Sequence, residues 1–413
     1  MKEQIKALVR ERMSKRRIVL FGAGIIAEEF YEEYKHVLNI SHCVSNIQKE
    51  WGKEMFMGEL DVKKFDKKEI QSEDYIIICG PIAFRTIEIQ LNNEGFRMYQ
   101  DFVESHIASA IFENKKIALF YGQCVLRDIF QCLKKVPAFE KEYMSIWTQT
   151  SKHQAVIGNR VLYYTKELCD LYVYTPKILD RDSIYNISRE ELPKDCQAVS
   201  VSNLIVSLYW PQIVPDIETF NEWYIHPYNA KRDLDFYHTL YRWEDRNINR
   251  MVSEGMMTEE IVKILSDENF YSEKQVNKTK KVSLKLISIA EKGVDIAVGD
   301  FIEDNYRSIR LYQNYIHSNK IVVWEYVRRL LNQIGVSTSE VAQLEKESPE
   351  HIHEGGDVPI YPSVAKCLNL EFIDKKTIYE VMTGKEIVYM TFGEYIEHYA
   401  EYTRKAMEIV HMW

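Results

Sequence analysis

The chain has 413 residues, and at about 150 residues per domain this length excludes a single small module. Its 53 Lys and Arg residues stand against 62 Asp and Glu residues, which gives a net charge of -9 without any long basic block. We therefore expect neither nucleic acid nor an anionic membrane surface as a partner. No run of about 18 apolar residues occurs, so we expect no membrane insertion.

The N-terminal segment MKEQIKALVRERMSKRR is charged throughout and lacks the apolar centre of a secretory signal. The seven cysteines are odd in number and show no C-x-x-C spacing, which argues against a disulfide framework and against a cysteine zinc site. We therefore expect a cytoplasmic protein with free thiols. Six of them are expected in or near the core: Cys43, Cys79, Cys132, Cys169, Cys196 and Cys367.

The first 110 residues are predicted to alternate between strands and helices. The expected elements are a basic helix at about 2–14, a strand in RIVLFGAG, a helix over 25–38, strands at 42–46 and 74–80, and a helix over 83–95. Strands that alternate with amphipathic helices indicate a parallel sheet.

A domain boundary is predicted at 104–116, because a second strand, KIALFYG, starts directly afterwards and leads into another helix. Further strands are expected at 160–165, 198–203 and 204–210, and helices at 236–252, 258–267, 279–293 and 322–335, with a loop at 345–363. The fold class is therefore α/β. A Rossmann-like domain (1–110) precedes a larger α/β domain (111–413) whose C-terminal half is rich in helices.

The segment GAGIIA has the G-x-G-x-x-[GA] pattern between a predicted strand and helix, with Gly22, Gly24 and Ala27 at its key positions. Such a turn lets the backbone approach a phosphate at a helix N-terminus. For NAD an acidic residue is expected about 20 residues later. Ser45 and Asn46 stand there instead. Three interpretations stay open: NAD or NADP, another nucleotide or nucleotide sugar held partly by Asn46, or a purely structural turn.

A second strand–turn–helix unit places Gly122, Gln123 and Cys124 at the turn and Arg127 one helical turn later. Backbone N–H groups at a helix N-terminus favour an anion, which activates a thiol and can stabilise an oxyanion. The turn is predicted to hold either a nucleophilic thiolate or a ligand's acyl or phosphate oxygen. The alternative is that Cys124 is only a small buried apolar residue.

The segment 298–331 carries Asp300, Asp304, Arg307 and Arg310 at helical spacings of three and four, followed by His317 at a predicted turn. Two interpretations are open. The arginines could hold phosphate or carboxylate while His317 acts as a general base, or the charges form a ladder of ion pairs on a helix surface.

Two other segments with histidines carry weaker signals. His351 and His353 lie between Glu350 and Glu354, but a flexible Gly-Gly loop and their spacing argue against a metal site, and we expect none. His226 lies in the aromatic segment WYIHPYN. This segment is expected either to line an acceptor pocket or to form a packed loop.

Residues 16–103 resemble the Rossmann-like domains that precede sugar-modifying domains in surface-polysaccharide enzymes, through FGAG, VSN and IIICGPIAFRTIEIQLNNEGF. Residues 116–375 resemble the WcbI-type polysaccharide biosynthesis family, through the GQC turn, DFIEDNYRSIRLYQNYIHS, IGV and IYPSVAKCLNL. That family's G-N-C-Q turn is matched by Gly122 to Val125, and its His-Pro step by His317 and Ser318.

This resemblance implies an acyltransferase that moves an acyl group from coenzyme A or acetyl-coenzyme A to a sugar hydroxyl during synthesis of a bacterial capsule. His317 would deprotonate the acceptor, and the turn from Gly122 to Cys124 would stabilise the oxyanion or pass the acyl group through the thiol. The residues expected to hold the coenzyme's phosphates are Arg127, Arg307 and Arg310.

Two alternatives belong to other classes: a non-catalytic module that binds nucleotides and glycans for a polysaccharide assembly system, and a hydrolase that removes acyl groups from glycans with the same Cys and His. The sequence specifies no oligomeric state.

Overall fold

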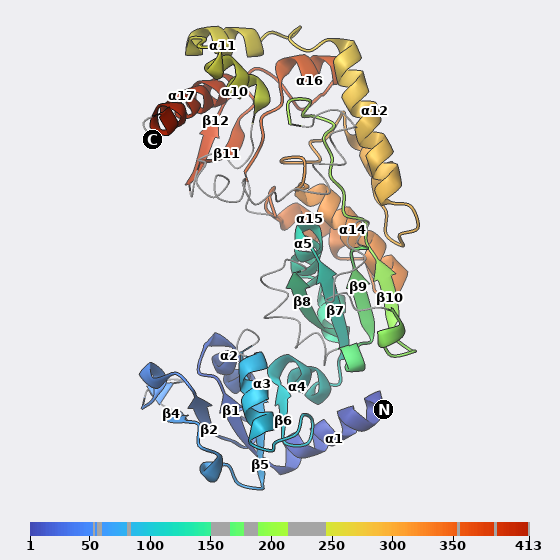
Figure 1. Ribbon diagram of the computed structural model, residues 1–413. Helices are drawn as coiled ribbons and strands as arrows, with labels where there is room; N and C mark the ends of the chain where they lie inside the picture. The colour runs from blue at the N-terminus through green and yellow to red at the C-terminus, as the bar shows by residue number, and fades with distance from the viewer. Residues whose placement is uncertain are drawn as a thin grey trace. The chain divides into compact units, whose positions relative to one another are not determined.

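The computed structural model describes the chain except for residues 53, 56–59, 81–83, 150–165, 177–188, 214–244, 353–355, 384–385 and 412–413. The chain forms two compact units. The first comprises residues 1–175, 182–200 and 335–337, and the second comprises 176–181, 201–334 and 338–413. Figure 1 labels most of their helices and strands.

The first unit begins with a six-stranded sheet and four helices. Its elements are α1 (Lys2–Lys15), β1 (Arg17–Phe21), α2 (Ile25–Tyr34), β2 (Ile40–Ser45), β3 (Glu54–Met55), β4 (Leu60–Lys64), β5 (Asp74–Ile78), α3 (Phe84–Asn93), β6 (Phe102–Glu104) and α4 (Ser105–Phe112). The strand order is β3-β4-β2-β1-β5-β6, and only the short β3 runs antiparallel to its neighbour. The predicted Rossmann-like parallel sheet is confirmed.

The alternating side chains of β1 explain why this sheet is buried on both faces. Ile18 and Leu20 pack into one apolar cluster, with residues of α1, α2 and α4, whereas Val19 and Phe21 pack into another with residues of α3. Strands covered on both faces read as continuous apolar runs, which is how RIVLF appears in the sequence.

The second sheet of this unit has four strands, all parallel, in the order β10-β9-β7-β8. Its elements are β7 (Lys116–Gly122), α5 (Cys124–Leu133), α6 (Pro137–Glu142), β8 (Tyr143–Gln149), β9 (Leu171–Tyr174) and β10 (Gln197–Ser200). The chain leaves β7 toward β8 on one side and later returns to β9 on the other. The strand order therefore reverses between β7 and β9.

The second unit contains mainly helices. They are α10 (Arg246–Ser253), α11 (Thr258–Leu265), α12 (Glu273–Ala290), α13 (Gly299–Asn305), α14 (Lys320–Ile334), α15 (Val341–Glu347), α16 (Pro362–Leu368) and α17 (Phe392–His411). An antiparallel hairpin joins β11 (Tyr379–Thr383) to β12 (Glu386–Met390). Among the described residues, no helix has the length and apolar character that crossing a membrane requires.

The α/β class is confirmed, but one predicted strand is wrong. Residues 204–210 are buried except for the partly exposed Ile205, yet they form no strand. Their backbone bonds are single contacts, such as Val206 N–H donating to the Tyr315 carbonyl at 2.8 Å, and Trp210 N–H closing a turn onto Ser207. Burial, not strand pairing, accounts for this apolar run. The division at residue 110 stays a prediction, and the expected strand at 160–165 lies outside the described residues.

Candidate functional site

The point where the strand order of the second sheet reverses carries the predicted Gly-Gln-Cys turn. In open parallel sheets, ligands bind beyond the carboxyl ends of the strands at such a point. Gly122 ends β7, and a Cβ atom built on it would lie 2.6 Å from Thr175 Oγ1 and 2.8 Å from a methyl carbon of Leu126. Only glycine therefore lets the turn approach both the residue after β9 and helix α5.

Cys124 is the first residue of α5, as the sequence analysis expected. Gln123 is the N-cap residue, and its backbone carbonyl accepts the N–H groups of Leu126 and Arg127 at 3.0 and 3.2 Å. Its side chain makes no capping hydrogen bond. The Cys124 thiol is partly exposed, whereas Cys132 on the same helix is buried. A thiol thus lies at the positive end of the helix dipole, next to first-turn N–H groups.

The buried atoms of the second sheet that lack a hydrogen-bond partner among the described residues include Thr175 Oγ1, just after β9, and the Trp147 indole nitrogen, in β8. Thr175 follows β9, and its N–H donates to the Tyr121 carbonyl of β7 at 3.2 Å. Trp147 lies in β8 opposite Phe120 of β7. Unsatisfied buried polar groups are rare and suit the polar atoms of a bound molecule. The sequence analysis missed both residues.

Arg127 lies one turn into α5, with its Nε 3.6 Å from a carboxylate oxygen of the buried Asp128. The turn thus brings together Gly122, Gln123, Cys124 and Arg127, which the sequence had grouped. The other expected site residues, His317, Arg307 and Arg310, belong to the second unit. The meeting of Cys124 with His317 stays a prediction.

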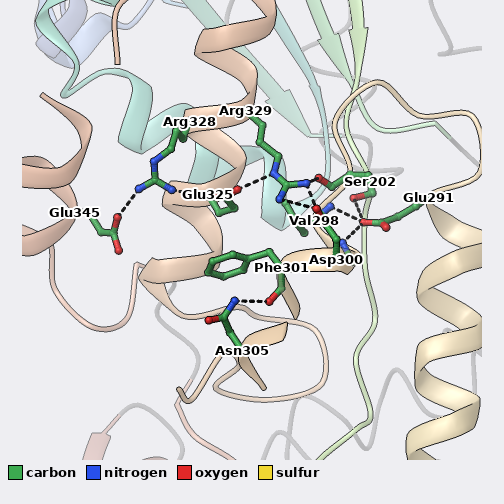
Figure 2. A network of polar contacts seen from close by, with 12 residues as sticks. Ser202, Glu291, Val298, Asp300, Phe301, Asn305, Glu325, Arg328, Arg329 and Glu345 are labelled. Carbon is green, nitrogen blue, oxygen red and sulfur yellow. Dashed lines mark hydrogen bonds and ion pairs between the residues drawn. The ribbon is translucent and has the colours of Figure 1, made fainter. Parts of the chain in front are cut away.

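The charged residues of 300–310 do not share a helical face, so that expectation is wrong. Helix α13 ends at Asn305, before Arg307. Figure 2 shows that Asp300 instead pairs with Arg329 of α14, whose guanidinium contacts the two carboxylate oxygens at 2.8 and 3.1 Å. The hydrogen bonds from Arg329 lower the pKa of Asp300. The ion pairs of Figure 2 join α13, α14 and α15 and serve packing.

Arg307 and Arg310, the two arginines of this segment, contact different residues. Arg307 Nε donates to the Tyr306 hydroxyl at 2.9 Å. Arg310 Nη1 donates to Asp357 Oδ2 at 2.9 Å, and its guanidinium lies 5.0 Å from the centre of the Tyr379 ring. Asp357 is almost completely buried, so this ion pair belongs to the interior of the second unit.

His317 lies at a turn shortly before α14, as expected, and is 2% exposed. The Gln313 N–H donates to the His317 carbonyl at 3.0 Å and closes the turn. Asn314, which is completely buried, accepts the N–H groups of Ile316 and His317 through Oδ1 at 3.1 and 2.9 Å. Its Nδ2 lies 3.3 Å from His317 Nδ1. The sequence analysis overlooked Asn314, although an Asn side chain that binds the N–H two residues later is a common turn signal.

The GAGIIA turn of the first sheet also lies between a strand and a helix, β1 and α2. Gly22 has φ +118°, and a Cβ on it would lie 2.5 Å from the Cys79 carbonyl oxygen after β5. Gly24 is the N-cap residue of α2, and Ala27 is completely buried. Asn46 Nδ2 donates to Gln90 Oε1 of α3 at 2.6 Å. Gly22 permits the tight turn and Ala27 packs in the core, as expected of the motif, while the phosphate-facing role of Gly24 and the ligand stay predictions.

A carboxylate that the sequence analysis missed lies near the end of β2. Ser45 Oγ donates to Glu50 Oε2 at 2.5 Å, and the Trp51 indole N–H donates to the Ser45 carbonyl at 2.8 Å. The dinucleotide-binding motif expects an acidic residue where Ser45 and Asn46 stand. Glu50 comes five residues after Ser45, so the spacing of the motif did not single it out.

His351 contacts protein groups on both ring nitrogens: Nδ1 lies 3.2 Å from Asn319 Oδ1, and Nε2 lies 3.4 Å from Asp357 Oδ1. His353 and His226 lie outside the described residues. Within the described part of the chain, no group of His, Cys, Asp and Glu has the arrangement of a metal site.

The profile of the family described as polysaccharide biosynthesis enzyme WcbI matches residues 126–339, which is more than half of the chain. The chain belongs to the WcbI family. Membership of this family indicates a role in polysaccharide biosynthesis. The matched segment contains Arg127, Arg307, Arg310 and His317 and begins just after Cys124.

A solved structure of WcbI has the same fold over 70% of this chain and 90% of its own, with a TM-score of 0.51 and 17% sequence identity. It is described as the native form of a novel polysaccharide biosynthesis enzyme, without a disulfide bond between coenzyme A and one of its cysteines. No curated protein matches the chain.

Proposed function

We propose that this WcbI family member is an acyltransferase that moves an acyl group from coenzyme A to a sugar hydroxyl in the synthesis of bacterial capsular or cell-surface polysaccharide. The observation that supports this most is the turn at the strand-order reversal, where Gly122 permits close approach and Cys124 starts α5. The description of the solved WcbI structure, which relates coenzyme A to a cysteine, supports the donor.

In the direct route, the sugar hydroxyl attacks the thioester carbonyl, the new C–O bond forms and the C–S bond breaks. The hydroxyl proton ends on the departing coenzyme A thiol. The N–H groups at the start of α5 stabilise the tetrahedral oxyanion. Removal of one such donor typically slows catalysis by about 100- to 1,000-fold. In the alternative route, the Cys124 thiolate takes the acyl group first and releases coenzyme A, and the sugar then attacks the acyl-enzyme.

Arg127 is proposed to contact the coenzyme's phosphates, since it projects from the helix that begins at the turn. Arg307 and Arg310 are proposed in the same role, although Arg310 already pairs with Asp357. The first sheet is proposed to bind a nucleotide sugar, or NAD, at Gly22 and Gly24.

The proposal is tested by incubating the full chain with radiolabelled acetyl-coenzyme A, with and without sugar acceptors. Acceptor-dependent release of coenzyme A supports transfer. Acceptor-independent release supports a deacylase, and the absence of both binding and release supports a non-catalytic module. The route is tested by trapping label on the protein: Cys124→Ala should remove trapped label, while the control Cys367→Ala, which removes another partly exposed thiol, should keep it.

A further inference from the structure

The buried side chain of Asn314 has an orientation that its partners determine. Its Oδ1 accepts the backbone N–H groups of Ile316 and His317 at 3.1 and 2.9 Å, and backbone N–H groups can only donate. Its Nδ2 donates to the Gly356 carbonyl at 3.2 Å, and a carbonyl can only accept. Exchanging the amide oxygen and nitrogen would place donor against donor and acceptor against acceptor, so the amide has one arrangement.

This arrangement fixes which nitrogen of His317 carries the ring proton. Asn314 Nδ2 has a second hydrogen and lies 3.3 Å from His317 Nδ1, so that ring nitrogen must accept. A neutral imidazole with an accepting Nδ1 carries its proton on Nε2. Protonation of Nδ1 would set an N–H against the N–H of Asn314, inside a region where His317 is 2% exposed.

We propose that Asn314 is a positioning residue that holds His317 as the Nε2–H tautomer, so that the imidazole donates a hydrogen bond from Nε2 and does not accept a proton there. The catalytic meaning of this tautomer rests on the proposed acyl transfer. In that reaction an imidazole held as the Nε2–H tautomer acts as a hydrogen-bond donor, and its proton stays on Nε2 throughout. This donor role replaces the general-base role expected from the sequence.

A half-buried histidine of the same unit, His351, provides an internal contrast. Asn319 Nδ2 donates to the Arg310 carbonyl at 2.8 Å, so its Oδ1 is the atom that faces His351 Nδ1 at 3.2 Å. That oxygen must accept, and His351 therefore carries a proton on Nδ1. The two Asn–His pairs of this unit thus present opposite amide atoms to Nδ1: a donor nitrogen faces that of His317, and an acceptor oxygen faces that of His351.

Long-range 1H–15N correlation spectra of the histidine-labelled full chain test the tautomer, because they distinguish protonated from unprotonated ring nitrogens in a neutral imidazole. We expect one imidazole with protonated Nε2 and unprotonated Nδ1 whose signals disappear in His317→Ala. In Asn314→Asp, a carboxylate oxygen faces Nδ1, and the proton should move to Nδ1 while the His351 signals stay. A wild-type His317 protonated on Nδ1 would overturn the proposal, and the wild-type spectrum decides this even if Asn314→Asp does not fold.

The positioning role is tested by rate. Asn314→Asp should lower kcat for acyl transfer at least tenfold and change its pH profile, while coenzyme A still shifts the melting temperature as in wild type. Full activity with an unchanged pH profile would refute the role of Asn314. If wild-type protein shows no transfer at all, the proposed function fails, but the spectra still decide the tautomer.

Discussion

The Tyr361 hydroxyl donates to the carboxylate of Asp245 inside the second unit, at 2.9 and 2.8 Å from its two oxygens. Asp245 is also the N-cap residue of α10, because its Oδ1 accepts the N–H groups of Asn247 and Ile248. Burial raises the pKa of Asp245 to about 6, and these hydrogen bonds only partly offset that effect.

Stability should therefore fall as pH rises from about 4 to about 6. In that window the folded protein still holds a proton on Asp245 that the unfolded chain, with an ordinary Asp pKa of about 3.9, has released. Unfolding then releases a proton, and the loss should reach about 3 kcal/mol above pH 6. Asp245→Asn keeps the cap acceptor and removes the titration. Urea unfolding of both proteins at pH 4.5 and 7.5 measures the difference, and parallel pH dependences would contradict this assignment.

Gly122→Ala should destabilise the first unit and impair coenzyme A binding. The added Cβ would lie within 2.6 Å of Thr175 Oγ1 and 2.8 Å of a methyl carbon of Leu126, and overpacking of this kind costs about 1–3 kcal/mol. Gly393→Ala, near the start of α17 with nothing within 4 Å, is the matched control. Chemical denaturation and a thermal-shift titration with coenzyme A measure both effects. Equal stability of the two variants would contradict the close packing at the turn.

Removing Asp357 should cost far more than removing Asp300. Asp357 is buried, pairs with Arg310 and accepts the Glu380 N–H at 2.9 Å, whereas the Asp300 side chain is 68% exposed. Breaking a buried pair leaves an uncompensated charge and costs about 3–5 kcal/mol, while exposed pairs contribute about 0–1 kcal/mol. Urea denaturation of Asp357→Asn and Asp300→Asn compares them, and similar losses would refute the distinction.

His317→Ala should lower acyl transfer at least about 100-fold while the affinity for coenzyme A stays close to wild type. His36→Ala, which changes an exposed histidine of the first unit, should retain full activity. Steady-state kinetics with a sugar acceptor that supports turnover measure the rates. Transfer at the wild-type rate in the His317 variant would remove that residue from the site.

The sequence predicted the strands and helices whose apolar periodicity is strong and continuous. Both strand–turn–helix units, with turns at Gly22 and Gly122, follow from local chemistry that needs no tertiary information. The hairpin of β11 and β12 was not predicted, since two short strands that pair only with each other carry little periodic signal.

The site was predicted only where its residues are neighbours in the chain. The Gly-Gln-Cys turn is local, and it was found. Arg310 and Asp357 lie far apart in sequence, so charge spacing suggested a helical ladder instead of their pair. Trp147 lies in β8 and Thr175 just after β9, and only the folded sheet brings these two segments next to the same strand, β7.

Helix α1 joins the two sheets of the first unit by charge. Lys2 and Lys6 contact opposite oxygens of Asp170, at 2.7 and 3.2 Å, and that carboxylate also accepts the Ile117 N–H at the start of β7. A fragment that starts after residue 110 would leave Asp170 without both ammonium groups and would uncover apolar surface around Ile117. Conversely, a chain cleaved once between the sheets should remain associated through this helix, so proteolytic nicking there need not release an independent N-terminal piece.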